Sequence, residues 1–166
     1  MKDRARFGLG VGLVPFLLGV AALSVGCEAP GVGDPCDPEN VPAGGFVSRE
    51  AYLETSSVQC RTRVCMVYKL QGDTDKVIGE HPDCPLDGTM DDDCVAGPGS
   101  GCDPSQATCV PARVYCTCRC DAPAGSSTST CECPDGYSCE PVLQLGGAGI
   151  RGSYCVKKST LGDEES

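Results

Sequence analysis

The chain has 166 residues and a formal net charge of −10, with 13 Lys and Arg against 23 Asp and Glu. This balance argues against nucleic acid as a partner, because binding to nucleic acid requires clustered basic side chains. Aromatic residues make up 5% of the chain and Trp is absent, whereas 15 residues are cysteine. A core with so few aromatic side chains is not expected to offset the conformational entropy of folding by itself. We therefore expect covalent cross-links to stabilise the fold.

The first 26 residues have the layout of an export signal. Lys2, Arg4 and Arg6 make a basic start, and residues 7–25 are uncharged and mostly apolar. A basic region, an apolar region and small residues in that order are typical of a secretory signal. As a membrane-spanning helix the run is marginal in length and is interrupted by Pro15 and several glycines. Without residues 1–26, which carry three basic residues and one acid, the charge becomes −12.

The apolar run ends at residues 23–27, which read Leu-Ser-Val-Gly-Cys. This ending resembles the lipobox of bacterial lipoproteins, with Ser24 at a position where that family prefers Leu. The resemblance implies cleavage before Cys27, a diacylglyceryl group on its thiol and acylation of its new amine. Three acyl chains anchor a protein firmly, whereas one holds only marginally. Glu28, rather than Asp, implies sorting to the outer membrane, facing the periplasm or the cell surface. A secreted protein with an ordinary cleaved signal and an uncleaved anchor are the alternatives.

The cysteine count supports the assignment of Cys27 to lipid and of the other cysteines to disulfides. With Cys27 assigned to lipid, 14 cysteines remain in 140 residues, an even number that suits seven disulfides. We expect a small disulfide-rich, mainly β fold of short hairpins and long irregular loops with little helix. The predicted disulfide cysteines are Cys36, Cys60, Cys65, Cys84, Cys94, Cys102, Cys109, Cys116, Cys118, Cys120, Cys131, Cys133, Cys139 and Cys155.

Composition divides the mature chain into three parts. Residues 27–45 are rich in Pro and Gly and predict a semi-stiff tether fixed to the domain at Cys36. Residues 46–156 form the disulfide-rich domain, either undivided or as two lobes, 46–84 and 85–156. Residues 157–166 end in an acidic run and predict a disordered tail.

Residues 48–57 predict a short helix capped by Ser48. Residues 58–70 alternate with period two and predict a half-buried strand or pair of strands. One face of this strand would carry Val58, Cys60, Thr62, Val64, Met66, Tyr68 and Leu70. Cys65 falls on the other face, so it should not pair with Cys60. Residues 72–111 are full of turn residues and predict an irregular loop region clipped by its four cysteines.

Residues 113–120 predict a second strand with Cys116, Cys118 and Cys120 on one face, and residues 150–156 predict a last strand. Neighbours two apart on a strand lie about 6.6 Å from each other, so these three cysteines need three separate partners. The economical arrangement is a hairpin that pairs Cys120 with Cys131 and Cys118 with Cys133. Residues 131–139, with Cys-x-Cys, a Gly-Tyr turn and a final Cys, partly resemble the closing half of an EGF-like module, which implies a similar hairpin.

Metal ligation is not expected. No two cysteines have the Cys-x-x-Cys spacing typical of zinc sites and thiol oxidoreductases, and His81 is the only histidine. An acidic cluster could offer oxygen ligands to calcium, but it lacks the EF-hand spacing, and a solvated acidic loop is favoured. Its members are Asp83, Asp87, Asp91, Asp92 and Asp93.

No catalytic motif stands out, so we expect neither an enzyme nor a cofactor. The favoured hypothesis is an envelope structural or protein-interaction module, bound to the membrane through lipid on Cys27, with an unidentified protein or envelope partner. The alternative is an inhibitor or ligand-binding module that presents a disulfide-braced loop, with calcium as a conceivable stabiliser. Residues 121–130 and 87–101 are the candidate loops. Neither carries a basic or bulky tip residue, which favours the first hypothesis.

Overall fold

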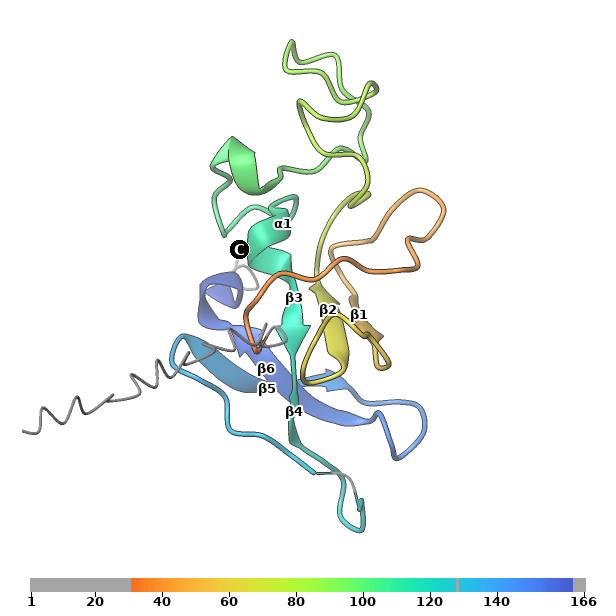
Figure 1. Ribbon diagram of the computed structural model, residues 1–166, viewed down its shortest axis with the longest axis vertical. Helices are drawn as coiled ribbons and strands as arrows, with labels where there is room; N and C mark the ends of the chain where they lie inside the picture. The colour runs from red at the N-terminus through yellow and green to blue at the C-terminus, as the bar shows by residue number, and fades with distance from the viewer. Residues whose placement is uncertain (1–30, 128, 163–166) are drawn as a thin grey trace, which may run out of the picture.

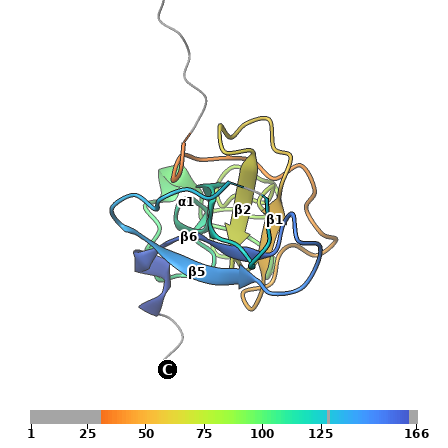
Figure 2. The ribbon, with the colours of Figure 1, turned by 90° about the horizontal axis from the view of Figure 1, so that it is seen from below.

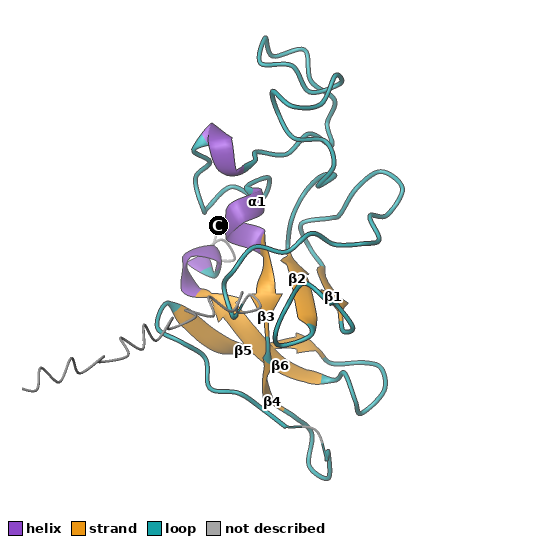
Figure 3. Cartoon of the chain, in the orientation of Figure 1, coloured by secondary structure: helices purple, strands orange, loops and turns teal. Residues whose placement is uncertain are grey.

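The computed structural model describes residues 31–127 and 129–162, so the expected signal peptide and Cys27 lie outside the described residues. The described chain consists mainly of two small antiparallel sheets joined by long loops (Figures 1 and 3). Within the described residues, helical structure is confined to α1 (Val110–Arg113) and two short 3₁₀ turns, η1 (Pro98–Ser100) and η2 (Lys158–Thr160). Together with seven disulfides, this confirms the predicted small, disulfide-rich, mainly β fold.

Each sheet has three strands. The first has the order β1 (Ala51–Glu54), β2 (Val64–Tyr68) and β3 (Val114–Thr117). The second has β6 (Gly152–Lys157) between β4 (Arg119–Asp121) and β5 (Tyr137–Leu143). Only Cys118 separates β3 from β4, so one extended segment belongs to both sheets. Seen from below, β5 and β6 run across the direction of β1 and β2 (Figure 2).

The first sheet is buried on both faces, because alternate side chains of β2 and β3 enter two different apolar clusters. One cluster contains Phe46, Cys60, Cys65, Val67, Leu70, Val95, Val114 and Cys116. The other, toward the second sheet, contains Met66, Tyr68, Tyr115 and Val156. Two hydrogen bonds tie the sheets together there: Thr117 Oγ1 donates to the Cys155 carbonyl (2.7 Å), and the Lys157 amide donates to the Tyr115 hydroxyl oxygen (3.1 Å).

The strand predicted over residues 58–70 is shorter, and two residues with positive φ explain why. Arg63 (φ 63°) and Lys69 (φ 51°) flank β2 in the left-handed region, which an extended strand cannot contain. Each ends the alternation, so Leu70 packs in the cluster of Val67 and not on the predicted face with Met66. The prediction that Cys60 and Cys65 do not pair is confirmed.

The helix predicted over residues 48–57 is wrong, since β1 lies there. Tyr52 pairs with Val67 of β2, and its ring meets that of Phe46 edge-on at 4.9 Å. Ser48 does not cap a helix; its backbone amide donates to the Gln71 side chain (3.3 Å). Strand pairing and ring packing at long range thus outweigh a weak local helix preference.

The described part of the expected tether, 31–45, lies along the domain. Gly33 donates its amide to the Cys116 carbonyl and Asp34 accepts from the Cys116 amide, both at 2.8 Å, which extends the first sheet at the free edge of β3. Gly33 (φ 94°) is required there, because a Cβ would lie 2.2 Å from the Tyr137 hydroxyl. As predicted, Cys36 attaches the segment, through a disulfide to Cys65.

Covalent or ordered structure continues across two of the expected boundaries, 84/85 and 157. The disulfides Cys84–Cys94 and Cys60–Cys116 both join residues on the two sides of position 84/85. The expected tail is ordered through its first residues: η2 follows β6 directly, and Thr160 is buried with Oγ1 donating to the Lys157 carbonyl (2.7 Å).

Residues 72–109 form the irregular region that the turn residues predicted, at the upper end of Figure 1. Isolated bridges join Val77 to Val95 and Ala96 to Cys109. Two short disulfides, Cys84–Cys94 and Cys102–Cys109, close loops within it. Its backbone is therefore fixed by cross-links and scattered hydrogen bonds in place of a continuous ladder.

We predict that reduction unfolds the domain. Each disulfide typically contributes about 2–4 kcal/mol by raising the free energy of the unfolded chain, and the two apolar clusters are small. In excess reductant at neutral pH, the near-ultraviolet circular dichroism of the tyrosines should collapse, while oxidised protein in matched buffer keeps it. A native-like spectrum after complete reduction would contradict this prediction.

Candidate functional site

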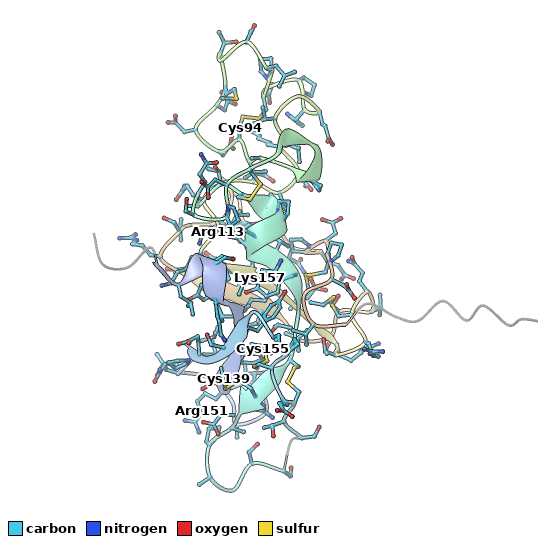
Figure 4. The ribbon with its side chains drawn as sticks, turned by 90° about the vertical axis from the view of Figure 1, so that its left-hand side faces the viewer. Cys94, Arg113, Cys139, Arg151, Cys155 and Lys157 are labelled. Carbon is cyan, nitrogen blue, oxygen red and sulfur yellow. A yellow bond between two sulfur atoms is a disulfide. The ribbon has the colours of Figure 1, made fainter. Side chains whose placement is uncertain are left out.

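All fourteen cysteines between residues 36 and 155 are paired. The pairs are Cys36–Cys65, Cys60–Cys116, Cys84–Cys94, Cys102–Cys109, Cys118–Cys131, Cys120–Cys139 and Cys133–Cys155. Figure 4 shows these bonds spread along the long axis of the molecule, from Cys94 near the upper end to Cys155 and Cys139 below. Every strand except β1 carries at least one cross-linked cysteine.

The closely spaced cysteines 116, 118 and 120 have three separate partners, as predicted. The specific hairpin pairing, Cys120 with Cys131 and Cys118 with Cys133, is wrong. The Cys131 amide donates to the Arg119 carbonyl (2.9 Å), which brings Cys131 beside Cys118. The ladder of strand β4 is with β6, and its contact with residues 131–133 is limited to that bond, so no regular hairpin imposes the expected register.

Two of these disulfides contact each other at β6. The Cys155 Sγ atom lies 3.8 Å from the Sγ atoms of both Cys118 and Cys131. Among residues 31–127 and 129–162, the groups of three or more potential metal ligands all consist of cysteines. Because each of those sulfurs is already in a disulfide, none offers the thiolate that zinc requires.

Two of the five acids in the loop that could have offered calcium ligands are paired with Lys76. Lys76 Nζ lies 2.9 Å from Asp93 and 3.5 Å from Asp91, and these hydrogen bonds, led by that with Asp93, raise the pKa of the Lys76 ammonium. Asp87 instead closes its own turn: it accepts from the Thr89 hydroxyl (2.7 Å) and amide (3.1 Å), which lower the pKa of its carboxyl. The structure thus brings together only Asp91 and Asp93 of the five predicted acids, around an ammonium.

His81 belongs to the same region, and its side chain makes polar contacts with Asp83. Its Nδ1 accepts a hydrogen bond from the Asp83 amide (3.2 Å) and lies 3.8 Å from the Asp83 carboxylate. Both side chains are substantially exposed. This is a local turn contact on the surface.

The disulfide loop 84–94 presents an apolar tip that sequence analysis missed. Leu86 is 82% exposed and Met90 41% exposed. The candidate loop 87–101 began one residue after Leu86, so the leucine went unnoticed. The sequence contained the information needed to find this leucine, because Cys84-Pro85-Leu86 places a large apolar residue two positions after a cysteine that closes a short loop.

Two buried arginines, Arg113 and Arg119, were not singled out from the sequence. Arg113 donates to the carbonyls of Gln106, Ser105 and Lys69 at 2.9–3.3 Å. Arg119 uses Nη1 to hold the carbonyls of Ala148 (3.2 Å) and Arg151 (3.0 Å). Both guanidinium groups fasten loops to the sheets.

Comparison of the chain with protein-family models, with curated proteins and with solved structures finds no match. Within the described residues, no helix has the length and apolarity needed to cross a membrane.

We predict that calcium does not bind the acidic loop. The carboxylates of Asp91 and Asp93 already share the Lys76 ammonium, and a divalent ion would need to displace it and find further oxygens. Calorimetric titration of chelator-treated protein with calcium chloride should give no heat beyond dilution. A saturable heat with a stoichiometry near one would overturn this interpretation.

Proposed function

We propose that this chain is a lipid-anchored extracytoplasmic module with a structural or protein-interaction role in the bacterial envelope. The observation that carries the proposal is the division of the cysteines. The fourteen that the structure describes pair among themselves, and the one outside it is Cys27, at the end of an export-type signal. Seven disulfides suit an oxidising compartment outside the cytoplasm.

The surface chemistry supports a role that is not enzymatic. Asp91 and Asp93 are engaged with Lys76, and Asp87 is engaged with its own turn. Among the described residues, the one carboxylate within ion-pair distance of His81 is that of Asp83. Buried arginines hold carbonyl groups of loops. A body fixed in this way loses little conformational entropy when it binds, which favours recognition by its rigid loops.

We predict that Cys27 determines membrane attachment. In an expressing Gram-negative cell, the wild-type protein should fractionate with the outer membrane, and its mass should exceed that of residues 27–166 by three acyl chains and a glycerol. Cys27→Ser should leave the disulfide-braced body intact and prevent lipidation. Ala29→Ser, which makes the same residue two positions away, should stay lipidated. Wild-type protein recovered with an unmodified Cys27 would contradict the anchor.

One observation favours the alternative, an inhibitor that presents a braced loop. Leu86 stands 82% exposed on the loop closed by Cys84–Cys94, at the upper end of the molecule (Figures 1 and 4). A bulky side chain held on a stiff loop is what an apolar protease pocket would accept.

The two functions separate in an assay against proteases that prefer apolar residues. The envelope proposal predicts no stoichiometric inhibition by the native protein. Leu86→Asp and Leu145→Asp form a matched pair, because these leucines are 82% and 83% exposed on different loops. Inhibition that Leu86→Asp abolishes and Leu145→Asp preserves would establish the inhibitor function instead.

A further inference from the structure

The link between the folded body and the proposed lipid anchor is short. Gly31, where the described chain begins, donates its amide to the Asp34 carboxylate (2.6 Å) and accepts from the Asp34 amide (3.2 Å). The residues that follow bond the free edge of β3, so the body fixes the chain from Gly31 onward. Residues 28–30 are all that separates Gly31 from Cys27, and a four-residue step spans at most about 14 Å when fully extended. An acylated Cys27 therefore holds the body close to the lipid headgroups.

The turn between β1 and β2, residues 55–63, lies beside this attachment point. A Cβ on Gly31 would lie 3.0 Å from Nη2 of Arg61. The Gln59 side chain accepts from the Asp37 amide (2.9 Å) and donates to the Asp37 carbonyl (2.6 Å), which holds the turn against the first residues of the body. Figure 2 shows the start of the described chain and this turn on the same side of the molecule. The anchor therefore brings the turn 55–63 to the membrane.

The turn 55–63 carries side chains that suit a lipid surface. Val58 is 70% exposed, and Arg61 and Arg63 are also exposed. Residues 55–72 contain no Asp or Glu, although the chain has 23 acids. An apolar side chain between basic ones can enter the bilayer interface while the guanidinium groups stay at the phosphates. Basic residues close to an anionic membrane surface are attracted to it.

The largest concentration of acids lies away from this turn. Residues 73–103 contain nine acids and one basic residue, Lys76. This region follows β2, whereas the turn precedes it, and it forms the upper end of the molecule in Figure 1. Asp34 and Asp37 border the turn, and the Asp34 carboxylate is engaged by the Gly31 amide. An anionic lipid surface repels the upper end, which favours approach through the turn.

We propose that the anchored body lies directly on an anionic lipid surface through the turn 55–63, with Val58 in the interface and Arg61 and Arg63 at the headgroup phosphates. The loop 84–94 then points away from the membrane. The proposal rests on the proposed lipid anchor and adds the orientation that this anchor gives to the body.

The absence of Trp from the chain allows a single-tryptophan test. Val58→Trp and Leu86→Trp form a matched pair, because the native side chains are 70% and 82% exposed. Each acylated variant is placed in vesicles of phosphatidylcholine and phosphatidylglycerol, with and without bromine on the acyl chains near the headgroup. We expect the emission of Val58→Trp to shift to the blue and to be quenched by the brominated lipid. The emission of Leu86→Trp should keep the wavelength and intensity of a solvent-exposed residue.

Equal quenching of the two variants, or quenching of neither, overturns the proposed orientation. A blue shift without quenching means that a protein, such as a second copy of the chain, covers the turn, and this result overturns the proposal too. Mass spectrometry separates these results from failure of the proposed function. An unmodified Cys27 contradicts the anchor itself, whereas an acylated Cys27 with unquenched Val58→Trp contradicts only the orientation.

The contribution of charge is tested in the Val58→Trp background. Arg63→Glu should reduce quenching on the anionic vesicles, because it reverses a charge placed at the headgroups. Arg49→Glu is the matched control, since it makes the same change at an exposed arginine outside the turn, and it should leave quenching unchanged. Omission of phosphatidylglycerol should reduce quenching as Arg63→Glu does. Equal quenching in the two arginine variants would contradict the headgroup contact assigned to this turn.

Discussion

The structure depends on the covalent cross-links around β6. Cys155 of this strand joins Cys133, and its sulfur also touches the Cys118–Cys131 bond, while the paired strand β5 is fixed to β4 through Cys139 and Cys120. Three disulfides thus converge on one three-stranded sheet. The other four hold the first sheet and the loops, where apolar clusters of a few residues could not offset the entropy of ordering long irregular segments.

Sequence analysis succeeded where chemistry or composition decides the outcome. The density of cysteines predicted the fold class, and the spacing of Cys116, Cys118 and Cys120 predicted separate partners. Sequence analysis failed where contacts with segments distant in the sequence determine the local structure. Residues 51–54 form a strand because β2 and Phe46 are present, and Arg63 and Lys69 adopt positive φ without any glycine to announce the turn. The pairing of Cys131 and Cys133 depended on β6, which lies about twenty residues further along the chain.

The candidate functional features differ in whether other groups of the chain already engage them. Two of the carboxylates that suggested a calcium site, those of Asp91 and Asp93, are held by Lys76, whereas the leucine at position 86 is exposed. Neither feature follows from composition, since the chain is acidic and poor in large apolar residues. A cross-linked body with an exposed apolar tip supports the proposed role in recognition.

A disulfide map of the native protein tests the central claim most directly, through mass spectrometry of peptides produced without reduction. The structure predicts linked peptides that join Cys118 to Cys131, Cys120 to Cys139 and Cys133 to Cys155. The proposed anchor predicts an acylated Cys27 that appears in none of them. A bridge that includes Cys27, or several free thiols among the other fourteen cysteines, would contradict both the architecture and the proposed location of the protein.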